Sequence, residues 1–190
     1  SGDQYLASRL RLANALFRSG KLEEARRVLQ ETTASNQKER GQLLIAEAQL
    51  LREANRHGDA LTVLESGLDQ HPDQPDLLYE SALTAEKVGR SEVLERNLRR
   101  LIELRPDYAH AYNALGYSLA DRNERLDEAQ QLIDKALSLS PNDPFILDSK
   151  GWVLFRMGNA AAALEVLQKA FGLRADPEIA AHLGEVLWSM

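Results

Sequence analysis

The sequence contains no cysteine among its 190 residues, which removes several kinds of chemistry. Without cysteine the chain has no disulfide framework, no thiolate nucleophile and no cysteine-based zinc site. No apolar run approaches the roughly 20 residues that span a bilayer, and the first residues do not form a signal peptide. Because the sequence starts with Ser-Gly instead of Met, we expect it to be part of a longer protein, with any targeting or anchoring segment outside it.

Aromatic residues make up only 6% of the chain, whereas Ala, Leu, Glu and Arg are abundant. This composition favours helices that pack through small side chains, so we predict an all-α fold. The hydrophobic content of 44% is sufficient for a sizeable core. The net charge of -6 argues against sequence-independent binding of nucleic acid, which needs a basic surface.

Small residues recur at a nearly constant interval at the centres of the predicted helices. They are Ala13, Ala48, Ala82, Gly116, Gly151 and Gly184, at intervals of 35, 34, 34, 35 and 33 residues. Each interval holds a helix, a turn and a second helix, which is a repeat architecture. One such unit cannot bury its own apolar face, so neighbouring units must stack, and the small residues allow close approach of their helices.

The period predicts a single array over residues 1–190 with about eleven helices. Its units are residues 6–38, 41–74, 75–108, 109–143, 144–176 and a terminal helix at 177–190. The polar stretch Ala34 to Arg40 lacks the proline that closes later units, so we expect the loosest join there. The turn of the fourth unit is one residue longer than that of the fifth, which accounts for the interval of 35.

The fourth unit carries the pattern that places the chain near a known family. Its key residues are Tyr112, Leu115, Gly116, Leu119, Ala129, Ile133, Ala136 and Pro141. This pattern resembles the tetratricopeptide repeat (TPR), and the resemblance covers nearly the whole chain. It implies a right-handed α-solenoid that binds a protein or peptide partner on its concave face and is not an enzyme.

The C-terminal units show a narrower resemblance. The runs NALGYSLAD, DPFILDSKGWVLFRMG and DPEIAAHLGEVLW are similar to the last repeats of bacterial cell-envelope TPR lipoproteins. These include an adaptor that binds and activates a periplasmic carboxyl-terminal processing protease. The resemblance implies that the partner is such a protease or its substrates. It also implies a periplasmic location, tethered to the outer membrane through a segment outside this chain; otherwise the protein would be cytoplasmic.

The TPR resemblance also implies which side chains line the concave groove, because the first helix of each unit supplies them. We take the candidate partner-binding residues to be Asn14, Gln49, Tyr79, Asn113, Tyr117, Asp148, Trp152, Phe155 and Trp188. Equivalent groove positions in the first two units are Leu10, Phe17, Ile45 and Arg52. A carboxylate clamp is not predicted, because Leu10 replaces the lysine that should precede Asn14.

The aromatic residues of the C-terminal half allow three interpretations. They can form a peptide-contacting patch, since aromatic anchors often dominate recognition. They can equally be ordinary packing between units, or be exposed only because of where the segment ends. If they form an exposed patch, replacing Trp152 and Phe155 by Ala should weaken partner capture without unfolding the protein. A different hypothesis is self-association, in which the final helix uses an uncovered face with Leu183 and Leu187.

No other residues form a recognisable chemical site. The four histidines, His57, His71, His110 and His182, are far apart in sequence, and we predict turn or surface positions for all of them. Arg96, Arg99 and Arg100 are expected on a solvated helix face with acidic neighbours. No nucleophile, base and orienting group occur together, and no nucleotide-binding motif is present. We therefore predict no catalytic residues, no metal, no cofactor, no nucleic-acid binding and no membrane contact by this segment.

Overall fold

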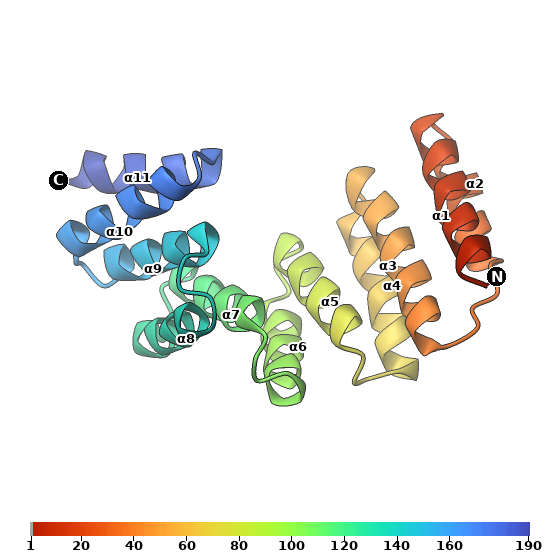
Figure 1. Ribbon diagram of the computed structural model, residues 1–190, viewed down its shortest axis with the longest axis horizontal. Helices are drawn as coiled ribbons and strands as arrows, with labels where there is room; N and C mark the ends of the chain where they lie inside the picture. The colour runs from red at the N-terminus through yellow and green to blue at the C-terminus, as the bar shows by residue number, and fades with distance from the viewer. Residues whose placement is uncertain (1) are drawn as a thin grey trace. The chain divides into compact units, whose positions relative to one another are not determined.

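The computed structural model describes residues 2–190, with side chains described from residue 4 onward, and that part of the chain is all-helical. Figure 1 shows its helices following one another as antiparallel pairs. In chain order the helices are α1 (Gly2–Arg18), α2 (Leu22–Gln30), α3 (Gln37–Glu53), α4 (His57–Gln70), α5 (Pro75–Lys87), α6 (Ser91–Leu104), α7 (Ala109–Asp121), α8 (Leu126–Leu139), α9 (Pro144–Arg156), α10 (Ala160–Leu173) and α11 (Pro177–Ser189). The predicted all-α class and the predicted eleven helices are confirmed within the described residues.

The helices group into two compact units, residues 1–100 and residues 101–190, with the boundary inside α6. We call them unit 1 and unit 2. Unit 1 contains α1 to α5 and most of α6, and unit 2 contains α7 to α11. The expectation of one continuous array over the whole chain stays a prediction.

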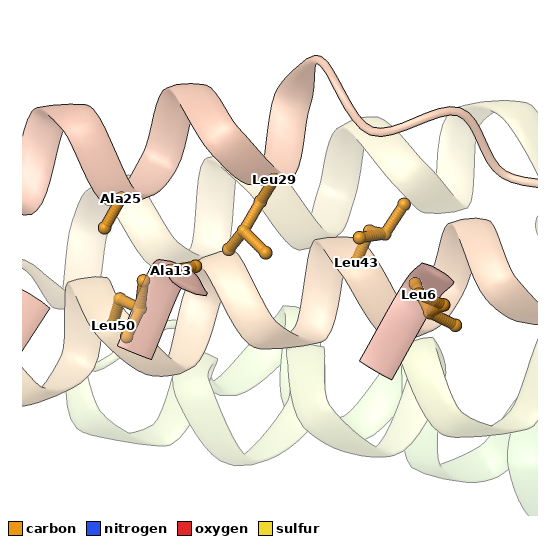
Figure 2. Close-up of a cluster of buried hydrophobic side chains, with 6 residues drawn as sticks. All are labelled: Leu6, Ala13, Ala25, Leu29, Leu43 and Leu50. Atoms are coloured by element: carbon orange, nitrogen blue, oxygen red, sulfur yellow. The ribbon is translucent and has the colours of Figure 1, made fainter. Parts of the chain in front are cut away.

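The core of unit 1 begins with side chains from three successive helices. Figure 2 shows this cluster, formed by Leu6, Ala13, Ala25, Leu29, Leu43 and Leu50. Ala13 of α1 packs in this cluster with Ala25 and Leu29 of α2, and its small methyl group lets α2 approach. Ala48 has the same place in the next pair and packs with Ala60 and Leu64 of α4. The small-residue period therefore marks the contact between the two helices of each pair.

In unit 2 the equivalent positions on α7 and α9 are Gly116 and Gly151, and the neighbouring helix leaves no room for a Cβ atom at either one. A Cβ atom added to Gly151 would lie 2.4 Å from Cγ of Leu167 on α10. At Gly116 it would lie 2.9 Å from two atoms of Ile133 and 3.0 Å from the carbonyl oxygen of Ala129. The glycines thus permit a helix contact that any side chain would widen. Gly184 on α11 is different, since an added Cβ would meet nothing within 4 Å.

The turns inside each pair follow the same period as the helices. In each of the five pairs, a residue with positive φ lies two residues after the end of the first helix: Gly20, Asn55, Gly89, Asn123 and Gly158. Glycine and asparagine are the residues that most easily adopt this left-handed conformation. The turn between α7 and α8 has a second such residue, Arg125 at φ 42°. This extra residue explains the predicted longer turn of the fourth unit.

The join between α2 and α3 is shorter than the sequence indicated. The expected loose stretch ran from Ala34 to Arg40, but α3 already begins at Gln37. The side chain of Asn36 accepts a hydrogen bond from the backbone N–H of Glu39, and the Glu39 carboxylate accepts one from the N–H of Ser35. This reciprocal cap fixes the start of the helix, so the prediction was wrong for residues 37–40.

No helix in residues 2–190 is both long and apolar enough to cross a membrane. Within the same residues, His, Asp and Glu side chains form no group of three that could hold a metal ion.

Candidate functional site

Unit 1 has a pocket of about 340 Å³ on the face formed by the first helices of its pairs. Its floor is apolar and its rim is polar. The floor residues are Leu10, Ala13, Leu29, Ile45, Ala46 and Leu50, and the rim residues are Asn14, Gln42, Gln49, Arg52 and Glu80. Leu10, Asn14, Ile45, Gln49 and Arg52 are groove positions that the TPR resemblance implied, and the structure brings them together. Phe17 and Tyr79, also at groove positions, are half-buried and do not line this pocket.

A hydrogen-bonded network centred on Arg52 borders the pocket. The guanidinium of Arg52 donates to Glu80 at 2.8 Å, to Thr84 at 3.1 Å and to Gln49 at 2.6 Å. Glu80 therefore balances the charge of Arg52. Because the rim is otherwise made of neutral amides, the pocket suits an uncharged apolar side chain with hydrogen-bonding groups beside it. No lysine lines it, consistent with the sequence argument against a carboxylate clamp.

In unit 2, two of the predicted contact residues are buried. Trp152 and Asp148 on α9 are each only 5% exposed. The ring of Trp152 stacks on His182 of α11, with centroids 4.5 Å apart, and lies 5.5 Å from the ring of Phe155. Trp152 is thus packed between helices, and its replacement would disturb the fold. A test that replaces Trp152 and Phe155 together would therefore not separate binding from folding. That these two residues contact a partner stays a prediction.

His182 is the clearest departure from the sequence analysis, which predicted a turn or surface histidine. It is 8% exposed, and its Nδ1 lies 2.9 Å from both carboxylate oxygens of Asp148. Its Nε2 lies 3.4 Å from the hydroxyl of Tyr117 on α7. His182 therefore joins three helices of unit 2. The other three histidines, His57, His71 and His110, are partly or fully exposed.

The electrostatic surroundings of His182 favour its charged form. Burial lowers the pKa of His182 and is the largest single influence. The hydrogen bond and the negative charge of Asp148, together with the charges of Glu178 and Glu185, outweigh burial and raise this pKa above its ordinary value. The Asp148–His182 pair is thus a buried ion pair below that pKa, covered on one face by Trp152.

The remaining predicted residues of unit 2 have varied surroundings. Asn113, Tyr117 and Phe155 are half-buried, whereas Trp188 is 93% exposed. Oδ1 of Asn113 and Nε1 of Trp152 are buried and have no hydrogen-bond partner among the described residues. Such groups carry unmet hydrogen-bonding capacity. They are covered, so a ligand reaches them only if neighbouring side chains move.

The arginine cluster of α6 is a set of surface ion pairs. Arg100 donates twice to Asp73, at 2.7 and 2.9 Å, and this hydrogen bond lowers the pKa of Asp73 below its ordinary value. Arg96 lies 3.7 Å from Glu65, and Arg99 lies 2.8 Å from Glu95. These carboxylates balance the arginines, consistent with the predicted solvated face.

Stacked antiparallel helix pairs of this kind are typical of an α-solenoid. Sequence models described as tetratricopeptide repeats match residues 10–75, 45–92 and 79–144, and a second TPR model matches residues 146–177. The chain therefore belongs to the TPR family. TPR domains are typically non-catalytic scaffolds for protein–protein interaction.

Individual relatives agree with this assignment. A TPR repeat-containing protein of Pseudomonas aeruginosa, PA4667, is 40% identical over 184 residues, which are 97% of this chain and 31% of that protein. The chain thus spans about a third of the length of this curated relative. The crystal structure of TTC0263 from Thermus thermophilus is 26% identical, with a TM-score of 0.71 over 79% of this chain and 82% of that one. YrrB, a TPR protein with an unusual peptide-binding site, is 21% identical, with a TM-score of 0.68 over 93% of this chain and 90% of its own.

Proposed function

We propose that this protein is a non-catalytic adaptor that holds a partner protein or peptide in the pocket of unit 1. The observation that carries the proposal is the convergence of groove positions from successive repeats on one pocket of about 340 Å³. An apolar floor with a few polar groups at its rim is the usual form of a recognition site. A protein of the same fold, YrrB, has a peptide-binding site, which supports a similar use here.

The chemistry of the pocket indicates which part of a partner it receives. Leu10, Ile45 and Leu50 offer an apolar surface, so an uncharged aliphatic or aromatic side chain fits. The amides of Asn14 and Gln49 lie beside it, where they can exchange hydrogen bonds with a peptide backbone. An acidic side chain is disfavoured, because Glu80 already pairs with Arg52 at the rim.

Filling the pocket should weaken this binding while leaving the fold intact. We expect Gln49→Trp to weaken capture about tenfold or more, since losing a central contact typically costs about 2 kcal/mol or more. Gln49 is exposed at the rim, so an indole there can cover the floor without disturbing the core. The measurement is crosslinked pull-down of partners by the full-length protein, compared with its Gln49→Trp variant.

The matched control is Thr62→Trp, which adds the same indole at an exposed position of α4 outside the pocket. It should capture partners as well as the wild type does. Equal capture by Gln49→Trp and wild type, at equal thermal stability, would show that the pocket of unit 1 is not the binding site.

We further propose that the partner is a periplasmic protease or its substrates. In this proposal the protein works in the bacterial periplasm, tethered to the outer membrane by a segment outside residues 1–190. The similarity of its C-terminal repeats to those of cell-envelope TPR adaptors supports this. The test is to add the purified protein to a carboxyl-terminal processing protease of the same organism and follow substrate cleavage. If the protein neither binds this protease nor changes its cleavage rate, the protease is excluded as the partner. The proposal that the pocket of unit 1 binds a partner would not be affected.

A second candidate function is self-association through α11. Gly184 has open space beside it, Leu187 is 52% exposed, and Trp188 is almost fully exposed. An apolar helix face of this kind can bind a second copy of the chain. We expect Leu187→Lys combined with Trp188→Lys to shift any dimer to monomer in light scattering. A mass that stays monomeric at every concentration in the wild type would exclude this function.

A further inference from the structure

His182 contacts side chains of two other helices in unit 2. It belongs to α11, its Nδ1 contacts Asp148 of α9, and its Nε2 faces Tyr117 of α7. Its ring also covers the ring of Trp152, at 4.5 Å and nearly parallel. Along the chain, α10 separates α9 from α11, and α8, α9 and α10 separate α7 from α11. This one side chain therefore supplies a polar link among three helices that are not consecutive.

α11 also makes apolar contacts with α9 and α10. Ile179 packs with Leu147 and Ala170, and Val186 packs with Ala163 and Leu167. These contacts do not depend on pH. The groups that face His182 and can carry charge or a proton are Asp148 from α9, Tyr117 from α7, and Glu178 and Glu185 from α11 itself. Arg156 of α9 lies on the ring of Trp152, 5.7 Å from its centroid.

The protonation state of His182 decides how well the buried carboxylate of Asp148 is balanced. An imidazolium gives Asp148 both an N–H and a positive charge, and it attracts the face of the Trp152 ring. A neutral imidazole can still donate one N–H, but it leaves a buried negative charge uncompensated. The neutral form should therefore hold α11 less firmly.

We propose that protonated His182 is a latch that fastens α11 onto α9 and α7, and that its deprotonation loosens α11 and uncovers the ring of Trp152. The latch makes access to an aromatic surface of unit 2 depend on acidity. It goes beyond the adaptor function, because it is independent of what binds in unit 1.

The sign of the effect follows from the pKa of His182, which is raised in the folded protein. A raised pKa means that the folded state binds the proton more tightly than the open state does. The latch is therefore fully fastened below the ordinary histidine pKa of about 6.5, and it weakens as pH rises from there through the folded-state pKa. The opening equilibrium of α11 should grow by about tenfold for every unit that separates the two pKa values.

The first test measures the pKa of His182. An NMR titration of the His182 ring should give a pKa above about 6.5 in the wild type. In Asp148→Asn the carboxylate charge is gone and burial remains, so the pKa of His182 should fall below the wild-type value. A wild-type pKa at or below about 6.5 would overturn the proposal.

The second test measures the loosening of α11 and the exposure of Trp152. It uses a Trp188→Phe background, which leaves Trp152 as the only tryptophan. Acrylamide quenching of Trp152 and hydrogen exchange of α11 amides, corrected for intrinsic rates, should both increase with pH and follow the NMR titration. His182→Gln removes the titrating imidazole and keeps Asp148, so this variant should lose the pH dependence. The matched control is His110→Gln, which alters an exposed histidine of α7 and should leave the dependence in place. Exchange of α11 that does not change between pH 5.5 and 8.5 in the wild type, whatever the NMR titration shows, would mean that there is no latch.

Discussion

Gly151→Leu is expected to destabilise unit 2 by about 1–3 kcal/mol or more, as overpacking of a close helix contact usually does. A Cβ atom at Gly151 would already lie 2.4 Å from Cγ of Leu167, and Leu167 is fully buried, so it has little room to move. The further atoms of a leucine would force α9 and α10 apart. The gain in helix propensity from replacing a glycine, about 1 kcal/mol, is too small to offset this.

The chain contains its own control for this substitution. Gly184 occupies the equivalent place on α11, but an added Cβ atom would meet nothing within 4 Å. Gly184→Leu should therefore leave unit 2 as stable as the wild type, or stabilise it by up to about 1 kcal/mol through helix propensity. The same substitution is thus expected to destabilise unit 2 at Gly151 and not at Gly184.

Tryptophan fluorescence gives a direct measurement, because both tryptophans, Trp152 and Trp188, belong to unit 2. Urea unfolding followed at this signal reports unit 2 without relying on two-state unfolding of the whole chain. If Gly184→Leu lowered the urea midpoint as much as Gly151→Leu does, the space beside each glycine would not explain the effect of the substitution.

The repeat pattern predicted the fold well because the constraint is strictly periodic. One small residue per pair is needed wherever two helices cross closely, and Ala48, Ala82 and Gly116 satisfy it with almost no exposed surface. Such a requirement recurs in each pair, so it is visible along a single sequence. The predicted start of α3 was too late, because the helix begins at a cap formed by Asn36. The polar composition of this stretch had indicated a loop instead.

The candidate site was predictable in unit 1 and less so in unit 2. The pocket of unit 1 uses groove positions in their expected orientation, so Asn14 and Gln49 lie where the resemblance implied. In unit 2, His182 comes from a position next to the expected ones and folds over Trp152. The available signal was the interval of one repeat between Asp148 and His182, since side chains one repeat apart on first helices are neighbours. Composition and spacing alone did not show that the pair is buried.

The second large effect is expected for Trp152→Ala, which should destabilise unit 2 by about 3–5 kcal/mol. The side chain is 5% exposed and contacts the rings of His182 and Phe155, so its removal leaves a cavity and an uncovered buried ion pair. Trp188 provides the matched control, because it is 93% exposed. Trp188→Ala should change the free energy of unfolding by no more than about 0.5 kcal/mol.

Urea unfolding followed by circular dichroism at α-helical wavelengths compares the two variants without needing either tryptophan. A change for Trp152→Ala as small as that for Trp188→Ala would contradict the packed position of the indole. If the expected loss is found, weaker partner capture by a Trp152 variant has a sufficient cause in the damaged fold. Binding by unit 2 must then be tested with side chains that are half-buried, such as Tyr117→Phe, which keeps the ring and removes only the hydroxyl that faces His182.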